Sequence, residues 1–238
     1  MMLNLRSVGM ALALVAAGSF GVWMKATSDP DMPRVSDWRR VSLSGHVLGS
    51  PSAPVRIVEF ADFQCEFCRD AETKLRSLRM YFHDSVAIVY RHLPVTSAHK
   101  WAFAAALAAE CAGQQGHFEE FHNTLYFDQK AIGVIPWGDF ATRSGVPDLR
   151  RFDECIRSNS GEASIHEDQM AAGRLHIPGT PTLLVNGWIF VGMPKQQLLR
   201  RYVRKAMDEA RSTGMDDWHT LVPATLAAVS TETTRTGK

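Results

Sequence analysis

The sequence predicts an α/β fold in which a block of helices interrupts a mixed sheet. Short apolar stretches rich in β-branched residues at 55–60 and 86–90 predict two strands, and the helical spacing over 69–81 predicts a helix between them. Two further strands, at 182–185 and 188–191, are followed by an amphipathic helix near the end of the chain. The predicted order is therefore β–α–β, a helical block, and β–β–α.

The predicted helical insertion occupies about residues 97–175. Its first part, Ala-rich residues 101–109, consists of strong helix formers. Two of the later segments open at or near a proline, which suits the first turn of a helix. The remaining helices of the insertion are predicted at 117–127, 136–144, 147–158 and 164–175.

The composition is that of an ordinary globular protein. The chain has 238 residues, of which 45% are hydrophobic and 21% are charged. Its 26 basic and 25 acidic residues give a formal net charge of +1, and no block of like charge stands out. We therefore expect no nucleic-acid partner.

The first 25 residues predict export. Arg6 precedes an apolar stretch over 8–24, which is typical of either a cleaved signal peptide or an uncleaved N-terminal anchor. A buried globular helix fits less well, because this stretch is apolar all round. Both main interpretations place the rest of the chain in the periplasm or an equivalent extracytoplasmic compartment, where disulfides persist. An anchor would tether the protein to the inner membrane.

The rest of the chain divides into three predicted parts. Residues 26–50 are largely polar and contain prolines, which favours a linker. Residues 51–210 hold the predicted domain. Residues 211–238 carry few core-forming side chains and end in a Thr-rich stretch, so we expect a C-terminal tail.

The sequence Cys65-Glu66-Phe67-Cys68 is the strongest chemical signal in the chain. It follows the first predicted strand and opens the first predicted helix. Unpaired N–H groups and the positive end of the helix dipole favour a thiolate at such a position. The thiolate is the reactive form of cysteine, so the motif predicts dithiol chemistry.

The two other cysteines, Cys111 and Cys155, predict a second, structural disulfide. Four cysteines in an exported chain make an even count, and the motif uses two of them. A closed loop of about 44 residues would stabilise the fold by roughly 4 kcal/mol on the chain-entropy model.

Taken together, these motifs resemble the thioredoxin fold. The resemblance rests on the strand–Cys-x-x-Cys–helix unit, on Gly179-Thr180-Pro181-Thr182 before a strand, on the Asn186-Gly187 hairpin turn and on the terminal helix. The helical insertion makes the chain similar to the DsbA-like thiol:disulfide oxidoreductases of the bacterial cell envelope. This likeness covers roughly residues 45–210.

The resemblance implies a role for each matching residue. Cys65 would be the nucleophile that forms a mixed disulfide with substrate, and Cys68 would resolve it. Thr180 and Pro181 would form a cis-proline loop that binds the substrate chain. Glu59 would be a buried acid that shuttles a proton to Cys68, although a solvent-facing charge on an edge strand is the alternative.

The resemblance also implies partners. We expect exported cysteine-containing proteins as substrates, a membrane redox partner that resets the active pair, and a monomer without metal or other cofactor. Glu66-Phe67 departs from the Pro-His pair of the strongest oxidases. We therefore expect a Cys65 pKa between about 3.5, as in DsbA, and about 7, as in thioredoxin.

Other functions stay open at this stage. The direction of exchange is undecided, so a reductase or isomerase of the envelope is an alternative. A further alternative is a non-catalytic envelope binding module whose cysteines form an inert disulfide.

Metal and haem sites find little support in the sequence. Zinc needs four ligands, yet Cys111 and Cys155 are isolated and nothing ties the His117-x4-His122 spacing to the Cys motif. Covalent haem needs a histidine at position 69, which is arginine. We expect the scattered histidines at 92, 99, 117, 122 and 166 to lie at the surface or the core rim.

Overall fold

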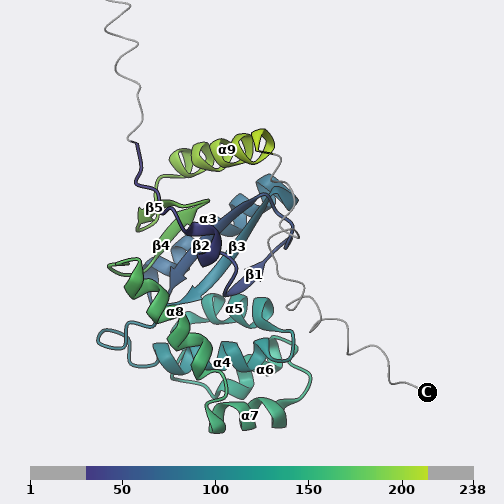
Figure 1. The fold of residues 1–238 in the computed structure, drawn as a ribbon. Coiled ribbons are helices and arrows are strands. Elements are labelled where there is room, and N and C mark those ends of the chain that lie inside the picture. The colour runs from purple at the N-terminus through teal and green to yellow at the C-terminus, as the bar shows by residue number, and fades with distance from the viewer. Residues whose placement is uncertain (1–30, 214–238) are drawn as a thin grey trace, which may run out of the picture. The chain divides into compact units, whose positions relative to one another are not determined.

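A five-stranded mixed sheet lies at the centre of the fold, in the order β1-β3-β2-β4-β5 (Figure 1). The central strand β2 (Val55–Ala61) pairs in parallel with β3 (Val86–His92) and antiparallel with β4 (Thr182–Val185). Strand β5 (Trp188–Val191) returns antiparallel to β4, and β1 (His46–Leu48) pairs antiparallel with β3. The four predicted strands are thereby confirmed.

The computed structural model describes residues 31–213. The predicted signal peptide or anchor over 1–25 lies outside the described residues, as does the predicted tail beyond residue 213. Within 31–213, no helix combines the length and the apolar character needed to cross a bilayer.

Two long helices belong to the predicted β–α–β and β–β–α units. Helix α3 (Glu66–Phe82) connects β2 to β3, and α9 (Gln196–Ser212) follows β5. Both are amphipathic, since apolar residues recur at helical spacing and turn towards the core. Leu75 and Leu78 of α3 and Val203 of α9 are fully buried. The fold therefore has the β–α–β and β–β–α units that the sequence predicts.

The predicted insertion is helical throughout and gathers on one side of the sheet (Figure 1). The disulfide between Cys111 and Cys155 joins α4 to α7, with the two Cα atoms 5.7 Å apart. The helices of the insertion are α4 (Ala102–Gly113), α5 (Phe118–Phe127), α6 (Trp137–Arg143), α7 (Leu149–Ser158) and α8 (Glu162–Arg174), with a short 3-10 turn at Gln129–Ala131. Another 3-10 turn, His83–Ser85, lies outside the insertion, between α3 and β3.

Helix α8 covers one face of the sheet. Its Ala171 and Ala172 join a buried cluster with Val58 and Phe60 of β2 and with residues of β3 and β4. Because side chains alternate across a strand, residue 59 between Val58 and Phe60 points to the opposite face. This alternation decides where Glu59 lies.

Part of the predicted linker over 26–50 is structured, which corrects the prediction. Helix α2 (Trp38–Val41) and the edge strand β1 lie within it. Trp38 is only 4% exposed and packs so closely under the β4–β5 hairpin that a Cβ at Gly187 would come within 2.6 Å of its ring. A four-residue helix and a three-residue strand are too short to show a hydrophobic period, so the polar composition dominated the sequence pattern.

Candidate active site

The cysteine motif begins helix α3 at the end of β2. Cys65 is the N-cap of the helix, with extended backbone angles, and its N–H donates to the Asp62 carbonyl at 3.1 Å. Cys65 is 6% exposed and Cys68 is fully buried. Both are free thiols. An incoming protein can therefore touch Cys65 but not Cys68.

The surroundings of the two sulfurs separate their acidities. The pKa of Cys65 falls from its ordinary 9.0 to about 5, chiefly because the Cys68 thiol donates a hydrogen bond to it. Burial opposes this fall, while the backbone of Cys68, Thr180 and the backbone of Phe67 add to it. Burial raises the pKa of Cys68 far above its ordinary value. At neutral pH Cys65 is therefore a thiolate and Cys68 keeps its proton.

Thr180 and Pro181 lie against Cys65. The peptide bond between them is cis, and the Cys65 Sγ is 3.6 Å from the Thr180 carbonyl oxygen. This loop joins helix α8 to strand β4, so it reaches the motif only because β4 pairs with β2. The sequence expectation that residues 180 and 181 accompany the motif in space matches this geometry.

Glu59 is buried on the central strand, beneath the motif. It is fully inaccessible, and neither carboxyl oxygen has a hydrogen-bond partner. Burial raises its pKa well above the ordinary value, with the nearby Glu72 and Cys65 adding to the effect. The alternative of a solvent-facing charge on an edge strand is wrong, because β2 is flanked by β3 and β4. Burial thus favours the neutral, protonated form of the Glu59 carboxyl group.

Asp62 organises the loop between β2 and the motif. Its Oδ1 accepts the Gln64 N–H at 2.8 Å, and its Oδ2 accepts the Val95 N–H at 2.8 Å and the His99 Nδ1–H at 2.7 Å. Asp62 therefore joins the loop of the motif to the segment that follows β3. Its link to residues 95 and 99 depends on the parallel pairing of β2 and β3, which brings the ends of both strands together.

Gln129 contacts the cysteine motif, although no pattern in the sequence marks it. Its Nε2 donates to the carbonyl oxygens of Phe63 at 2.8 Å and of Cys65 at 2.9 Å. It comes from the 3-10 turn after α5, and its side chain is buried. One side chain of the helical insertion therefore holds the backbone on both sides of Gln64.

A groove of about 400 Å³ runs beside the motif and the cis-proline loop. Phe67, at the centre of the motif, lines it and is 73% exposed, and Val191 at the end of β5 is 67% exposed. The other lining residues are Asp70, Lys74, Pro178, Gly179, Thr180, Pro181, Gly192 and Met193. An extended chain that enters this groove would lie next to Cys65.

The expectation for two histidines is wrong. His92 and His122 are buried in a group of aromatic rings that includes Phe63, Tyr90 and Phe118, rather than at the surface or the core rim. Burial lowers the pKa of His122 to about 3, so this ring is neutral. Cys111 and Cys155 are bonded to each other, so they supply no ligands to the motif.

The fold and the paired cysteines define an oxidoreductase of the thioredoxin class. The family model described as Thioredoxin matches residues 42–205, and the chain belongs to this family. The resemblance to DsbA-like thiol:disulfide oxidoreductases is also confirmed at the level of fold. Two solved structures document it.

A thioredoxin-like oxidoreductase from Silicibacter pomeroyi DSS-3 is 27% identical, with a TM-score of 0.60 over 75% of this chain and 98% of that one. The α-DsbA1 protein of Wolbachia pipientis superposes with a TM-score of 0.59 over 74% of this chain and 98% of its own. Its 15% identity supports the fold alone.

A relative that is named as an antiporter also matches. The Na(+)/H(+) antiporter NhaA 3 of Salinispora tropica is 39% identical over 166 residues. These residues are 70% of this chain but 25% of that protein. The chain thus spans about a quarter of the length of this relative.

Proposed function

We propose that this protein is a DsbA-like thiol:disulfide oxidoreductase that exchanges disulfides with cysteines of exported proteins. The observation that carries the proposal is the pairing of a low-pKa, accessible Cys65 with a buried Cys68 beside the cis Thr180–Pro181 loop. Disulfide exchange needs one reactive cysteine and one buried cysteine. An inert structural disulfide needs no such difference between its two cysteines.

Exchange proceeds through a mixed disulfide at Cys65. When the pair is oxidised, a substrate thiolate attacks the Cys65 Sγ, the Cys65–Cys68 bond breaks, and Cys68 leaves with the bonding electrons. A second substrate thiolate then attacks its partner sulfur and releases Cys65 as a thiolate. The substrate loses two electrons and two protons. Both electrons pass to the pair, one proton goes to Cys68 and the other to solvent.

Glu59 is suited to supply the proton that Cys68 needs. Its carboxyl group has no hydrogen-bond partner, and in its ionised form the negative charge raises the pKa of Cys68. A neutral acid at this depth can protonate the leaving sulfur without bringing water into the core. In the reverse reaction the same group takes the proton back.

The low pKa of Cys65 favours the donation of disulfides. A sulfur with a low pKa is a good leaving group, so a mixed disulfide at Cys65 is readily transferred to the substrate. A pKa of about 5 lies between those of DsbA and thioredoxin, which agrees with a milder oxidant than DsbA. Exposed Phe67 and the groove beside it would hold an unfolded, apolar segment of the substrate.

The proposal places the protein in the periplasm or an equivalent compartment, as a monomer. Support comes from the apolar N-terminal stretch of the sequence and from the Cys111–Cys155 disulfide, since disulfides persist outside the reducing cytosol. Each turnover leaves the pair reduced. A membrane redox partner that accepts its electrons is therefore part of the proposed function.

Two measurements test the proposal. The reduction potential of the Cys65–Cys68 pair is the first. A value close to that of DsbA, about −120 mV, supports an oxidase, whereas a value close to that of thioredoxin, about −270 mV, supports a reductase. Cys68→Ala should accumulate reductant-sensitive adducts with disulfide-containing exported proteins, because Cys65 attacks and nothing resolves the product. Cys65→Ala is the matched control and should form none. Equal adduct formation by both variants would overturn the assignment of roles.

A further inference from the structure

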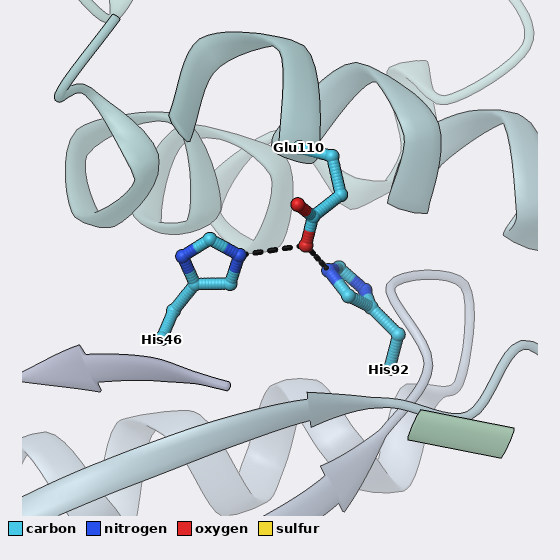
Figure 2. A group of neighbouring side chains, drawn as sticks. All are labelled: His46, His92 and Glu110. Atoms are coloured by element: carbon cyan, nitrogen blue, oxygen red, sulfur yellow. Dashed lines mark hydrogen bonds and ion pairs between the residues drawn. The ribbon is translucent and has the colours of Figure 1, made fainter. Parts of the chain in front are cut away.

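Two histidines and a glutamate converge between the sheet and helix α4 (Figure 2). His46 Nε2 lies 2.6 Å and His92 Nε2 lies 2.9 Å from the same oxygen, Glu110 Oε1. One candidate ligand atom from each of the three residues lies within 4.8 Å of the others. Three donor atoms thus point to one small volume.

The three residues come from separate elements. His46 begins the edge strand β1, His92 ends β3, and Glu110 lies in the last turn of α4. In Figure 2 the two rings rise from the sheet and the carboxylate descends from the helix. Since 46, 92 and 110 have no short spacing in sequence, the zinc patterns of the sequence could not show this cluster.

The shell around the cluster holds its rings in place. The Phe118 ring stacks on His46 with 3.4 Å between ring centroids and 4° between ring planes. A Cβ at Gly161 would come within 2.5 Å of the Glu110 Cβ, and one at Gly113 within 3.1 Å of the His46 ring. Glycine at both positions therefore leaves room for the side chains that meet here.

The cluster is closed on one side and open on the other. The His92 side chain is 1% exposed and that of Glu110 is 8% exposed, whereas that of His46 is 26% exposed. An ion can therefore reach the donor atoms past His46. Once bound, it would be shielded from bulk water by His92 and Glu110.

We propose that His46, His92 and Glu110 form a binding site for a divalent transition-metal ion, with Zn²⁺ as the ion that the donors suit best. Two imidazole nitrogens and a carboxylate oxygen are common zinc ligands, and a water molecule completes four-coordination. This proposal departs from the sequence expectation that the protein carries no metal.

The distances allow the ion to enter with small movements. Bonds of about 2.0–2.1 Å in tetrahedral geometry separate neighbouring donors by roughly 3.3 Å. The present Nε2–Oε1 distances of 2.6 and 2.9 Å are shorter, so the donors must move apart by less than 1 Å, roughly.

A bound ion would tie the sheet to the helical insertion. It would link β1 and β3 to α4, the helix that also carries Cys111 of the disulfide. His92 also lies near Phe63, with 5.9 Å between their ring centroids. Phe63 precedes Cys65 by two residues. The expected consequence is a more stable fold when metal is present, since ligands that bind only the native state stabilise it.

The test is a calorimetric titration of the full chain with Zn²⁺ after treatment with a chelator. The Cys65–Cys68 pair is kept oxidised, so that its thiolates cannot bind zinc. One equivalent should bind per chain, and zinc should raise the melting temperature. His46→Gln and Glu110→Gln should each weaken binding at least tenfold and abolish that rise.

His166→Gln is the matched control, because exposed His166 hydrogen-bonds Glu162 at 3.0 Å on the surface of α8. It should bind zinc as the unchanged protein does. Circular dichroism establishes whether each variant is folded. If Glu110→Gln does not fold, His46→Gln is the deciding variant, because His46 is partly exposed and its replacement disturbs the core less. The proposal is overturned if the unchanged protein binds no zinc, or if His46→Gln binds it undiminished.

Discussion

The Cys65 Sγ lies 3.6 Å from the carbonyl oxygen of Thr180, although 115 residues separate the two in sequence. The contact arises because β4, which follows Thr180 and Pro181, pairs with β2, which precedes the cysteine motif. A chain that binds along residues 180–181 would therefore lie next to the Cys65 sulfur.

The first prediction concerns the ionisation of Cys65. In the reduced protein, the rate of alkylation of Cys65 should rise with a midpoint near pH 5, since its pKa is about 5. Cys68→Ala should move the midpoint upwards, because the hydrogen bond from Cys68 makes the largest contribution to the low pKa. A midpoint near 9.0 in the unchanged protein would contradict the proposed nucleophile.

The same shift has a consequence for stability. The pKa of Cys65 is lower in the folded state than in the unfolded chain, so folding favours the thiolate. The reduced protein should therefore gain stability relative to the oxidised protein as the pH rises from about 5 towards 9.0, and lose that gain as the pH falls through about 5. Urea unfolding of both forms at several pH values measures the difference.

The second prediction separates the stability cost of Glu59 from its chemical use. A buried, unpaired carboxyl group costs about 1–3 kcal/mol, so Glu59→Leu should stabilise the oxidised protein by about that amount at neutral pH. The same change should slow the release of Cys68 about a hundredfold, because no acid protonates the leaving sulfur.

Glu59→Gln is the matched control for this prediction. It keeps the size and polarity of the side chain but cannot give up a proton, so it should slow exchange without the gain in stability. Stopped-flow measurement of mixed-disulfide formation from the oxidised protein gives the rate. If both variants exchange at the normal rate, Glu59 has no part in the reaction.

The third prediction concerns the loop before the motif. Asp62→Ala removes an acceptor of three hydrogen bonds, from Gln64, Val95 and His99, and should destabilise the protein by about 3 kcal/mol. Denaturant unfolding measures this loss. Asp153→Ala, at an exposed position of α7, should change the free energy of unfolding by less than about 0.5 kcal/mol.

The fourth prediction concerns the disulfide between α4 and α7. Replacing both Cys111 and Cys155 by alanine should lower the free energy of unfolding by about 4 kcal/mol, since the bond closes a loop of 44 residues. The exchange rate at Cys65 should stay unchanged under conditions where the variant is folded. A mild dithiol should reduce the Cys65–Cys68 pair while the buried Cys111–Cys155 bond stays intact, which mass spectrometry can follow.

Much of the fold could be predicted because its signals are local. The strands at 55–60 and 86–90 and the helix of the motif show their hydrophobic period within a few residues. The Asn186-Gly187 turn likewise fixes its own geometry, since both residues adopt positive φ. In contrast, α2 and β1 are too short for such a pattern, and their place in the fold depends on the burial of Trp38.

The candidate site divides in the same way. Cys65 and Cys68 can be found from sequence because their spacing on one helix is itself the functional geometry. Gln129 and His99 carry no such signal, since each acts on a loop far away in the chain.

By itself, the sequence determined the β–α–β and β–β–α units with the helices between them, the redox pair, and the resemblance that points to Pro181 and Glu59. These depend on the chemistry of neighbours along the chain. Only the tertiary structure decided that Thr180 touches Cys65, that Glu59 is buried without a partner, and that His46, His92 and Glu110 meet. Such contacts arise when distant segments pack against each other, and packing leaves no repeating pattern in the chain.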